Sequence, residues 1–227
     1  MDAPRGYAND NRHLRRLKAG KIEHLLGGVE GLDLLDLGAG SGLLSEYFAS
    51  KGANVTAADR DPDKFLAALP FVTIGDRLPF APESFDVVVF NHVIEHVGDR
   101  PQQSAMLEQI ATILRPGGRL YLAAPTKWAL IEPHFRIPLL GAMPRRLADW
   151  VVRLSGKGKW YDCYPLPRAD LHTMIAQRFA RVEDVSTAAF KWMCRHENPT
   201  LRMVPPIPAL FPTAIFIASK GPAGDPR

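Results

Sequence analysis

Short, largely apolar runs alternate with helical patterns along the first half of the chain. The runs cover residues 34–37, 55–58, 71–74, 84–90 and 119–123. Residues 43–50, between the first two runs, show the spacing of an amphipathic helix. Continuous apolar runs are typical of parallel strands that are buried on both faces. The pattern therefore predicts an α/β fold in which helices cover both faces of a mostly parallel sheet.

The other segments have less regular patterns. Residues 9–27 predict an amphipathic helix that ends at two glycines, residues 168–179 predict another helix, and residues 181–186 and 213–219 predict two more strands. Residues 127–167 are rich in aromatic residues and proline, and they interrupt the alternation. Ligands of open α/β sheets bind at the carboxyl edge of the strands, so we interpret this insertion as a cap that binds an acceptor molecule.

This organisation divides a single domain into five segments. They are an N-terminal helical cover (1–29), a core (30–126), the cap insertion (127–167), a C-terminal helix with strands (168–220) and a tail without predicted order (221–227). A second irregular segment, 190–211, contains several prolines and methionines. No internal repeat is found.

The first apolar run leads into three glycines at alternate positions, Gly38, Gly40 and Gly42. This predicts a tight turn before a helix N-terminus, where nucleotide-like ligands bind. A dinucleotide fingerprint needs its third glycine one position later, where this chain has Leu43. Asp36, two residues before the turn, would repel a pyrophosphate but could hold a cationic amino acid. S-adenosylmethionine (SAM) suits both features, because it carries an ammonium and a sulfonium and has no phosphate.

Acidic residues also follow the second and third runs. Asp59 lies about twenty residues beyond the glycines, where a carboxylate can accept hydrogen bonds from both ribose hydroxyls. Asp76 follows the third run, and Asn91 and His92 follow the fourth. The sequence Leu-Arg-Pro-Gly-Gly at 114–118 predicts a turn before the fifth strand.

These motifs, over roughly residues 30–126, resemble those of the class I SAM-dependent methyltransferases. Within that class they are similar to the type 11 group, which includes quinone and small-molecule methyltransferases. The resemblance implies a Rossmann-like, doubly wound, mostly parallel sheet of seven strands with an antiparallel last strand. It also implies that the helix at 9–27 covers the cofactor cleft, although packing on the sheet edge remains an alternative.

The resemblance further implies a set of residues that bind the cofactor SAM. Asp59 would hold the ribose, Arg60 would lie along the adenine, and Asp76 would contact the adenine amino group. The whole set is Asp36, Gly38, Ala39, Gly40, Gly42, Asp59, Arg60, Asp76, Arg77, Asn91 and His92.

The motif His92-x-x-Glu95-His96 has three interpretations. On a helix, His92 and His96 would share one face. They and Glu95 could form a structural pair that fixes the start of the helix, either histidine could be a general base toward a hydroxyl acceptor, or the group could bind a metal. The similar E-x-x-E-H of ubiquinone-biosynthesis O-methyltransferases, some of which use a divalent metal, keeps the third interpretation open. We favour the structural pair and expect no metal.

Two features of the cap are candidates for contact with the acceptor. His134 lies among apolar residues, either as an acceptor contact or base or as an ordinary surface histidine. Arg145, Arg146 and Arg153 belong to one amphipathic helical pattern. They would bind a phosphate, a carboxylate or a membrane surface, or they form the polar face of an ordinary helix.

Charge is divided unevenly along the 227 residues, whose net charge is +4. Residues 31–126 hold 7 basic and 12 acidic residues, whereas residues 127–203 hold 13 basic and 7 acidic. The basic half favours an anionic acceptor, a membrane surface or a nucleic acid, unless it is simply a solvated face. No dense basic stripe with interleaved aromatics appears, so we expect no nucleic acid partner.

Length and cysteine content favour one cytoplasmic domain. No apolar stretch is long enough to span a membrane, and residues 1–10 lack the apolar core of a signal peptide. The two cysteines, Cys163 and Cys194, are interpreted as free thiols in a reducing compartment, although a disulfide between them is an alternative.

Two functions are consistent with these observations. The first is methyl transfer from SAM to a small molecule that bears a hydroxyl and is largely apolar, such as a quinone, polyketide, lipid or lipid-linked sugar. His92, His96 and His134 are then the candidate catalytic residues. The second is a catalytically silent module that binds SAM or a partner through its basic half. The sequence does not set the oligomeric state.

Overall fold

The structure is a computed structural model of the chain, and it describes residues 12–200, 206–207 and 211–222. One seven-stranded sheet runs through it in the order β3-β2-β1-β4-β5-β7-β6. The strands are β1 (Asp33–Leu37), β2 (Asn54–Asp59), β3 (Phe71–Thr73), β4 (Phe85–Asn91), β5 (Leu114–Pro125), β6 (Arg181–Asp184) and β7 (Thr213–Ser219). β7 is antiparallel to both β5 and β6, and the other pairs are parallel. The predicted fold class is confirmed.

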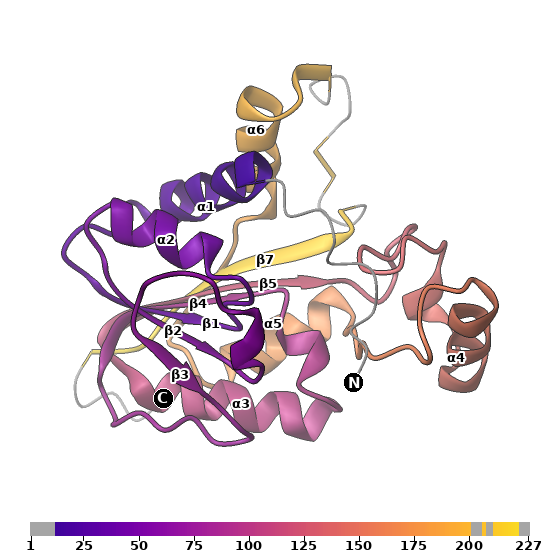
Figure 1. Cartoon of the computed structure of the whole chain (residues 1–227), viewed down its shortest axis with the longest axis horizontal. Helices are drawn as coiled ribbons and strands as arrows, with labels where there is room; N and C mark the ends of the chain where they lie inside the picture. Colours follow the sequence, from indigo (N-terminus) through magenta and orange to yellow (C-terminus); the bar gives the residue numbers. More distant parts are fainter. Residues whose placement is uncertain (1–11, 201–205, 208–210, 223–227) are drawn as a thin grey trace.

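Helices cover both faces of the sheet (Figure 1). The α-helices are α1 (Arg12–Leu26), α2 (Leu43–Ser50), α3 (Arg100–Ile113), α4 (Arg145–Leu154), α5 (Arg168–Ala176) and α6 (Ser186–His196). Single 3₁₀ turns are η2 (Pro62–Lys64), η3 (Ile94–His96) and η4 (Leu140–Ala142). Residues of α1, α2 and α6 share one hydrophobic core with one face of the sheet, and residues of α3 and α5 share a second core with the other face.

Local sequence explains most of these elements. The central strands β1 and β4 are apolar on both sides because helices cover both faces, and Leu34, Leu35, Val87 and Val88 are fully buried. α3 begins at a capping box, in which the Asp99 carboxylate accepts from the Gln102 backbone N–H. The chain crosses over between β1 and β4, which places a topological switch point at their carboxyl ends.

Two details differ from the sequence predictions, and two further predictions are not tested. β5 begins at Leu114, so residues 114–118, where we predicted a turn, belong to the strand. The pairing of β5 with β4 has a register shift between Phe85 and Val87. α6 occupies part of the segment that we predicted to be irregular. The predicted start of the first helix at residue 9 and the tail beyond residue 222 lie outside the described residues.

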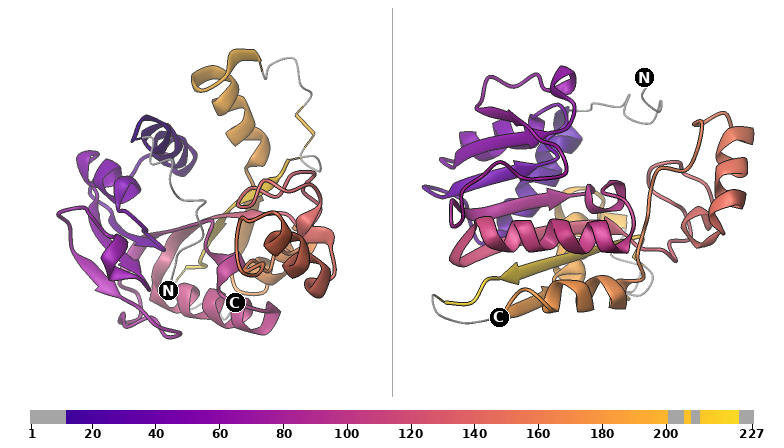
Figure 2. Two further views of the ribbon diagram at one scale, coloured as in Figure 1. Left: turned by 45° about the vertical axis from the view of Figure 1, so that its right-hand side comes forward. Right: turned by 90° about the horizontal axis from the view of Figure 1, so that it is seen from below.

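The cap insertion lies to one side of the main body, with α4 at its outer end (Figure 2). It has a small hydrophobic core of its own, which consists of Phe135, Ile137, Leu140, Ala148, Val152, Tyr161 and Cys163. The cap returns to the sheet at Tyr164, whose backbone N–H donates to the Glu95 carbonyl at 2.7 Å. A bridge between Thr126 and Leu166 closes its base. The cap therefore contacts the carboxyl end of β4 directly.

Candidate functional site

The glycine turn follows β1 as predicted. Gly38, Gly40 and Gly42 have φ values of 82°, 55° and 83°, a conformation that side-chain-bearing residues rarely adopt. At Gly38 there is also no room for a side chain, because a Cβ would lie 2.3 Å from Cγ2 of Val93. Val93 follows β4, so the glycine turn and the end of β4 are in close contact. The turn leads into α2, whose first backbone N–H groups face the carboxyl edge of the sheet.

Asp59, the last residue of β2, joins β2 to this turn. Its Oδ2 accepts a hydrogen bond from the Gly40 N–H at 2.8 Å, and its Oδ1 accepts from the Asp61 N–H at 3.1 Å. The backbone N–H groups of Gly38 and Ala39 both donate to the Ala58 carbonyl. Asp59 thus lies beside the turn, where the predicted ribose contact would need it. The contact itself remains a prediction.

Asp36 is buried beneath the turn. Its Oδ2 accepts from the Ser45 hydroxyl at 2.6 Å, which links β1 to α2. Burial raises the pKa of Asp36 to about 6, although the Ser45 hydrogen bond works in the opposite direction. A cationic ligand group beside this carboxylate would stabilise its charged form. The two carboxylates therefore fit SAM, because Asp36 suits its cationic amino acid part and Asp59 suits its ribose hydroxyls.

The predicted adenine-side residues lie along the edge formed by β2 and β3. Asp76 is exposed and forms an ion pair with Arg60. Arg77 is also exposed, and Asn91 is the half-buried last residue of β4. These positions are compatible with the predicted roles, which stay predictions.

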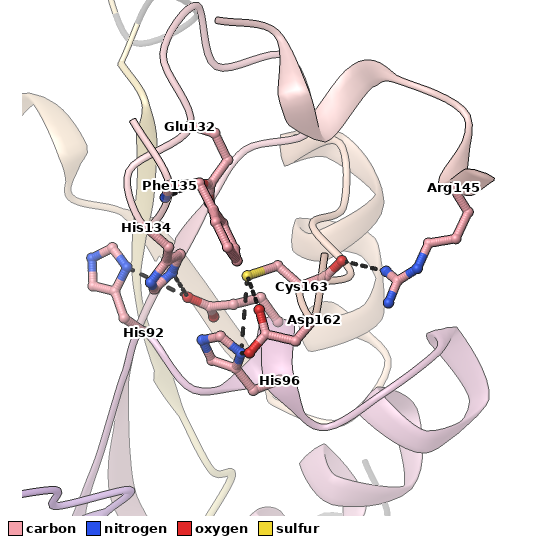
Figure 3. Close-up of polar contacts among 9 residues, drawn as sticks. His92, His96, Glu132, His134, Phe135, Arg145, Asp162 and Cys163 are labelled. Carbon is pink, nitrogen blue, oxygen red and sulfur yellow. Dashed lines mark hydrogen bonds and ion pairs between the residues drawn. The ribbon is translucent and has the colours of Figure 1, made fainter. Parts of the chain in front are cut away.

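The three candidate catalytic histidines lie together (Figure 3), and the Glu95 carboxylate contacts two of them, His92 and His134. His92 Nδ1 lies 3.5 Å from Glu95 Oε1, and His134 Nε2 lies 2.9 Å from the same oxygen. The rings of His96 and His134 are 4.9 Å apart, centroid to centroid. Helical spacing does not bring them together as we expected, because His92 has a φ of 58° and only the single turn η3 follows it. The cap delivers His134 from a distant part of the sequence.

Burial and the contacts with the Glu95 carboxylate shift the pKa values of these three histidines and of Glu95 in different directions. Burial alone would raise the pKa of Glu95, but contacts with His134 and His92 lower it below its usual value. Burial lowers the pKa of His92 and of His96, against the opposing effect of Glu95. For His134 the carboxylate outweighs burial, and its pKa is raised. At neutral pH, Glu95 is therefore charged and His92 is a neutral imidazole that can accept a proton.

Two further residues of the cap, Asp162 and Cys163, lie close to His96, a contact that no sequence motif indicated. Asp162 Oδ2 lies 3.6 Å from His96 Nδ1, and the Sγ of Cys163 lies 3.9 Å from the same nitrogen. Burial is the main reason that the pKa of the Cys163 thiol is raised. Arg145 holds this segment of the cap, because its Nη1 donates to the Cys163 carbonyl at 2.8 Å and its guanidinium lies over the Tyr164 ring. Arg145 is thus a structural residue of the cap.

Lys18 of α1 is close enough to Glu95 and His92 for their charges to interact. Burial, with help from Arg15 and Lys21, lowers the pKa of Lys18 to about 8. Its charge in turn contributes to the lowered pKa of His92. α1 packs on α2 and α6, and it therefore carries a basic side chain toward the carboxyl edge of the sheet, on the side where we predicted a helical cover.

Known methyltransferases are similar to this chain in sequence. The model of a methyltransferase domain family matches residues 35–122. A ubiquinone biosynthesis O-methyltransferase from Xanthomonas euvesicatoria is 30% identical over 187 residues, which cover 76% of this chain and 73% of that protein. A protein of the same name from Xylella fastidiosa is 32% identical over 171 residues, 70% of this chain. The match spans 64% of the length of that Xylella relative.

Solved structures show the same fold at lower sequence identity. A SAM-dependent methyltransferase from Mesorhizobium loti aligns with a TM-score of 0.61 and 16% identity, over 93% of this chain and 99% of the other. The magnesium protoporphyrin IX methyltransferase of Synechocystis PCC 6803, solved with bound S-adenosylhomocysteine, aligns with a TM-score of 0.56 and 19% identity, over 92% and 84% of the two chains.

Proposed function

Because the chain belongs to the family of class I SAM-dependent methyltransferases, we propose that it methylates a hydroxyl group of a largely apolar, quinone-type small molecule. The observation that carries this proposal is the pair of His92 and Glu95 at the end of β4, beside the glycine turn. The quinone-type acceptor is supported by the relatives named for ubiquinone biosynthesis.

The site residues fit the cofactor. When SAM is bound, its sulfonium makes the methyl group electrophilic. Asp36 lies below the turn and suits the ammonium, and Asp59 lies beside the turn and suits the ribose hydroxyls. These residues bind and orient the ligand, so that an acceptor held under the cap is aligned with the methyl group.

His92 is proposed as the general base. Its neutral imidazole would accept the proton of the acceptor hydroxyl as that oxygen takes the methyl group from SAM. Glu95 orients the ring and stabilises the imidazolium that results. The products are the methyl ether, S-adenosylhomocysteine and a proton on His92. His134, held at 2.9 Å by the same carboxylate, is proposed to position Glu95.

Calorimetric titration and methyl transfer test this function. Micromolar binding of SAM and of S-adenosylhomocysteine, without binding of NAD, is expected. Radiolabelled methyl groups should then transfer to hydroquinones and catechols that carry an isoprenoid tail, and less well to tail-less analogues. NAD binding tighter than SAM binding would refute the cofactor assignment. SAM binding without transfer to any hydroxyl acceptor would favour the catalytically silent module.

We also propose that the cap contacts an anionic membrane surface in which such an acceptor is dissolved. The cap exposes many large apolar side chains, namely Trp128, Leu130, Ile131, Leu139, Leu147, Trp150, Leu154, Trp160 and Tyr164. Arg146, Arg153 and Lys159 are exposed among them. Aromatic and aliphatic groups interspersed with basic ones match the acyl and headgroup layers of an anionic bilayer. In the part of the chain that the structure describes, no helix is long and apolar enough to cross a membrane.

A further inference from the structure

Three potential metal ligands converge where the cap contacts the end of β4. His96 belongs to η3, and His134 and Cys163 belong to the cap. One ligand atom from each residue lies within 4.8 Å of the others. The three residues are far apart in the sequence, so the fold of the cap creates the group (Figure 3).

The donor types select a particular class of cation. A thiolate and two imidazoles are soft or borderline ligands, which suit Zn²⁺, whereas Mg²⁺ and Ca²⁺ prefer oxygen. The Sγ of Cys163 and Nδ1 of His96 are 3.9 Å apart. Zn–S and Zn–N bonds of about 2.3 and 2.0 Å at a tetrahedral angle place the two atoms about 3.5 Å apart. A shift of a few tenths of an ångström would therefore suffice for both atoms to bind one ion.

The surroundings of these three residues have the features of a metal site, namely a buried ligand, a further donor and access from solvent. Cys163 is 1% exposed, and Arg145 fixes its backbone. Asp162 provides a fourth donor, because its Oδ2 is 3.6 Å from His96 Nδ1 and its Oδ1 is 3.7 Å from the Cys163 Sγ. The side chain of Asp162 is 38% exposed, which leaves a path for an ion from solvent.

Against the expectation from the sequence that no metal is bound, we propose that His96, His134 and Cys163, completed by Asp162, bind one Zn²⁺ ion. The ion would connect the cap to the carboxyl end of β4. On binding, the Cys163 thiol releases its proton to solvent as the Zn–S bond forms, so that the ion gains a thiolate ligand. His92 is outside this set, so the site does not depend on the proposed role of His92 in catalysis.

Direct metal binding tests the proposal. Untagged full-length protein is titrated with Zn²⁺ against a chromophoric chelator, and one tightly bound ion per chain is expected. Cys163→Ser should weaken this binding by on the order of 100-fold, because a direct ligand contributes more than the outer partners whose loss costs about 10–100-fold. Cys194→Ser is the matched control, since it removes the other buried free thiol, on α6, and should leave binding unchanged.

Cobalt substitution identifies the ligands without any assay of activity. Co²⁺ should give the near-ultraviolet absorption of a thiolate complex in the wild type, in Cys194→Ser and in His92→Ala, but not in Cys163→Ser. The lack of stoichiometric Zn²⁺ binding would overturn the proposal. So would full-strength binding in Cys163→Ser together with loss in His92→Ala, because the ion would then occupy the alternative group of His92, Glu95 and His134. Loss of methyl transfer in His92→Ala with an unchanged cobalt spectrum would separate the two proposals.

Discussion

The Asp59 carboxylate accepts a hydrogen bond from the backbone N–H of Gly40 at 2.8 Å, which ties the end of β2 to the glycine turn after β1. The two residues belong to neighbouring parallel strands whose carboxyl ends meet at the same edge of the sheet. This bond shapes the turn, so Asp59 affects ligand binding both by holding the turn and by its own predicted contact with the ribose.

Asp59→Asn should weaken SAM binding by roughly 10-fold or more, since hydrogen bonds to a charged group contribute about 1.5–3 kcal/mol. Calorimetric titration with SAM and S-adenosylhomocysteine measures the effect. Asp61→Asn is the matched control, because Asp61 lies nearby and its carboxylate caps the turn η2 and pairs with Lys64. Equal affinities in the two variants would argue against the predicted role of Asp59.

Gly38→Ala should destabilise the protein more than Gly40→Ala. Both positions have positive φ, which costs an alanine about 1–2 kcal/mol. Only at Gly38 would the new methyl group overlap Val93, and overpacking adds about 1–3 kcal/mol. Urea denaturation measures the difference. Val93→Ala combined with Gly38→Ala should recover part of the loss, and the absence of any recovery would contradict the proposed overlap.

Asp36→Asn should change the pH dependence of stability. The pKa of Asp36 is about 6 in the folded protein and about 3.9 in the unfolded chain, so the unfolded chain loses its proton first. Wild-type stability therefore falls as pH rises from about 4 to about 6, by up to roughly 3 kcal/mol from this group. The difference in unfolding free energy, variant minus wild type, should rise over that interval. SAM affinity in the wild type should increase with pH through the same range, and in Asp36→Asn this dependence should flatten.

His92→Ala should lower kcat by about 10²- to 10⁴-fold with little change in SAM affinity, as expected for a general base. His24→Ala, on the exposed side of α1, is the control.

Glu95→Gln tests the same role through the pH profile of kcat. Because the Glu95 charge raises the pKa of His92, its removal should shift the acidic limb of the kcat profile to lower pH. An unshifted limb would mean that another group is the base.

The sheet and the glycine turn could be predicted because each depends on a few consecutive residues. The apolar runs of β1 and β4 and the alternate glycines carry their own conformational preferences. α6 was missed because its composition resembled the irregular segment that follows it. Asp59 and Asp36 were expected near the turn, and their bonds to Gly40 and Ser45 agree with that position.

The cluster around Glu95 could be predicted only in part. His92, Glu95 and His96 are close in sequence, but their geometry follows from the positive φ of His92 and not from a helix. His134, Asp162 and Cys163 reach the cluster because the cap packs its own small core and returns to Glu95 through Tyr164. No local pattern encodes a contact that spans 39 residues, as the one between His134 and Glu95 does.

Membrane contact by the cap gives a prediction that depends on charge and apolar surface together. Wild-type protein should cosediment with vesicles that contain phosphatidylglycerol, and much less with phosphatidylcholine vesicles. Each basic residue near an anionic surface contributes about 1 kcal/mol, so added salt should release the protein.

Trp150→Ala combined with Leu154→Ala should lower vesicle binding by at least about 10-fold, since burial of each side chain would contribute up to about 1.5–3 kcal/mol. These two side chains are 59% and 67% exposed, so their loss should leave the thermal midpoint unchanged.

Leu66→Ala is the matched control, because Leu66 is 78% exposed but lies outside the cap, next to the glycine turn. If Leu66→Ala weakened vesicle binding as much as the double variant, the membrane contact would not belong to the cap. If the double variant methylated a short-tailed acceptor normally but a long-tailed one in vesicles poorly, the cap would act by bringing the site to the membrane and not by shaping the site itself.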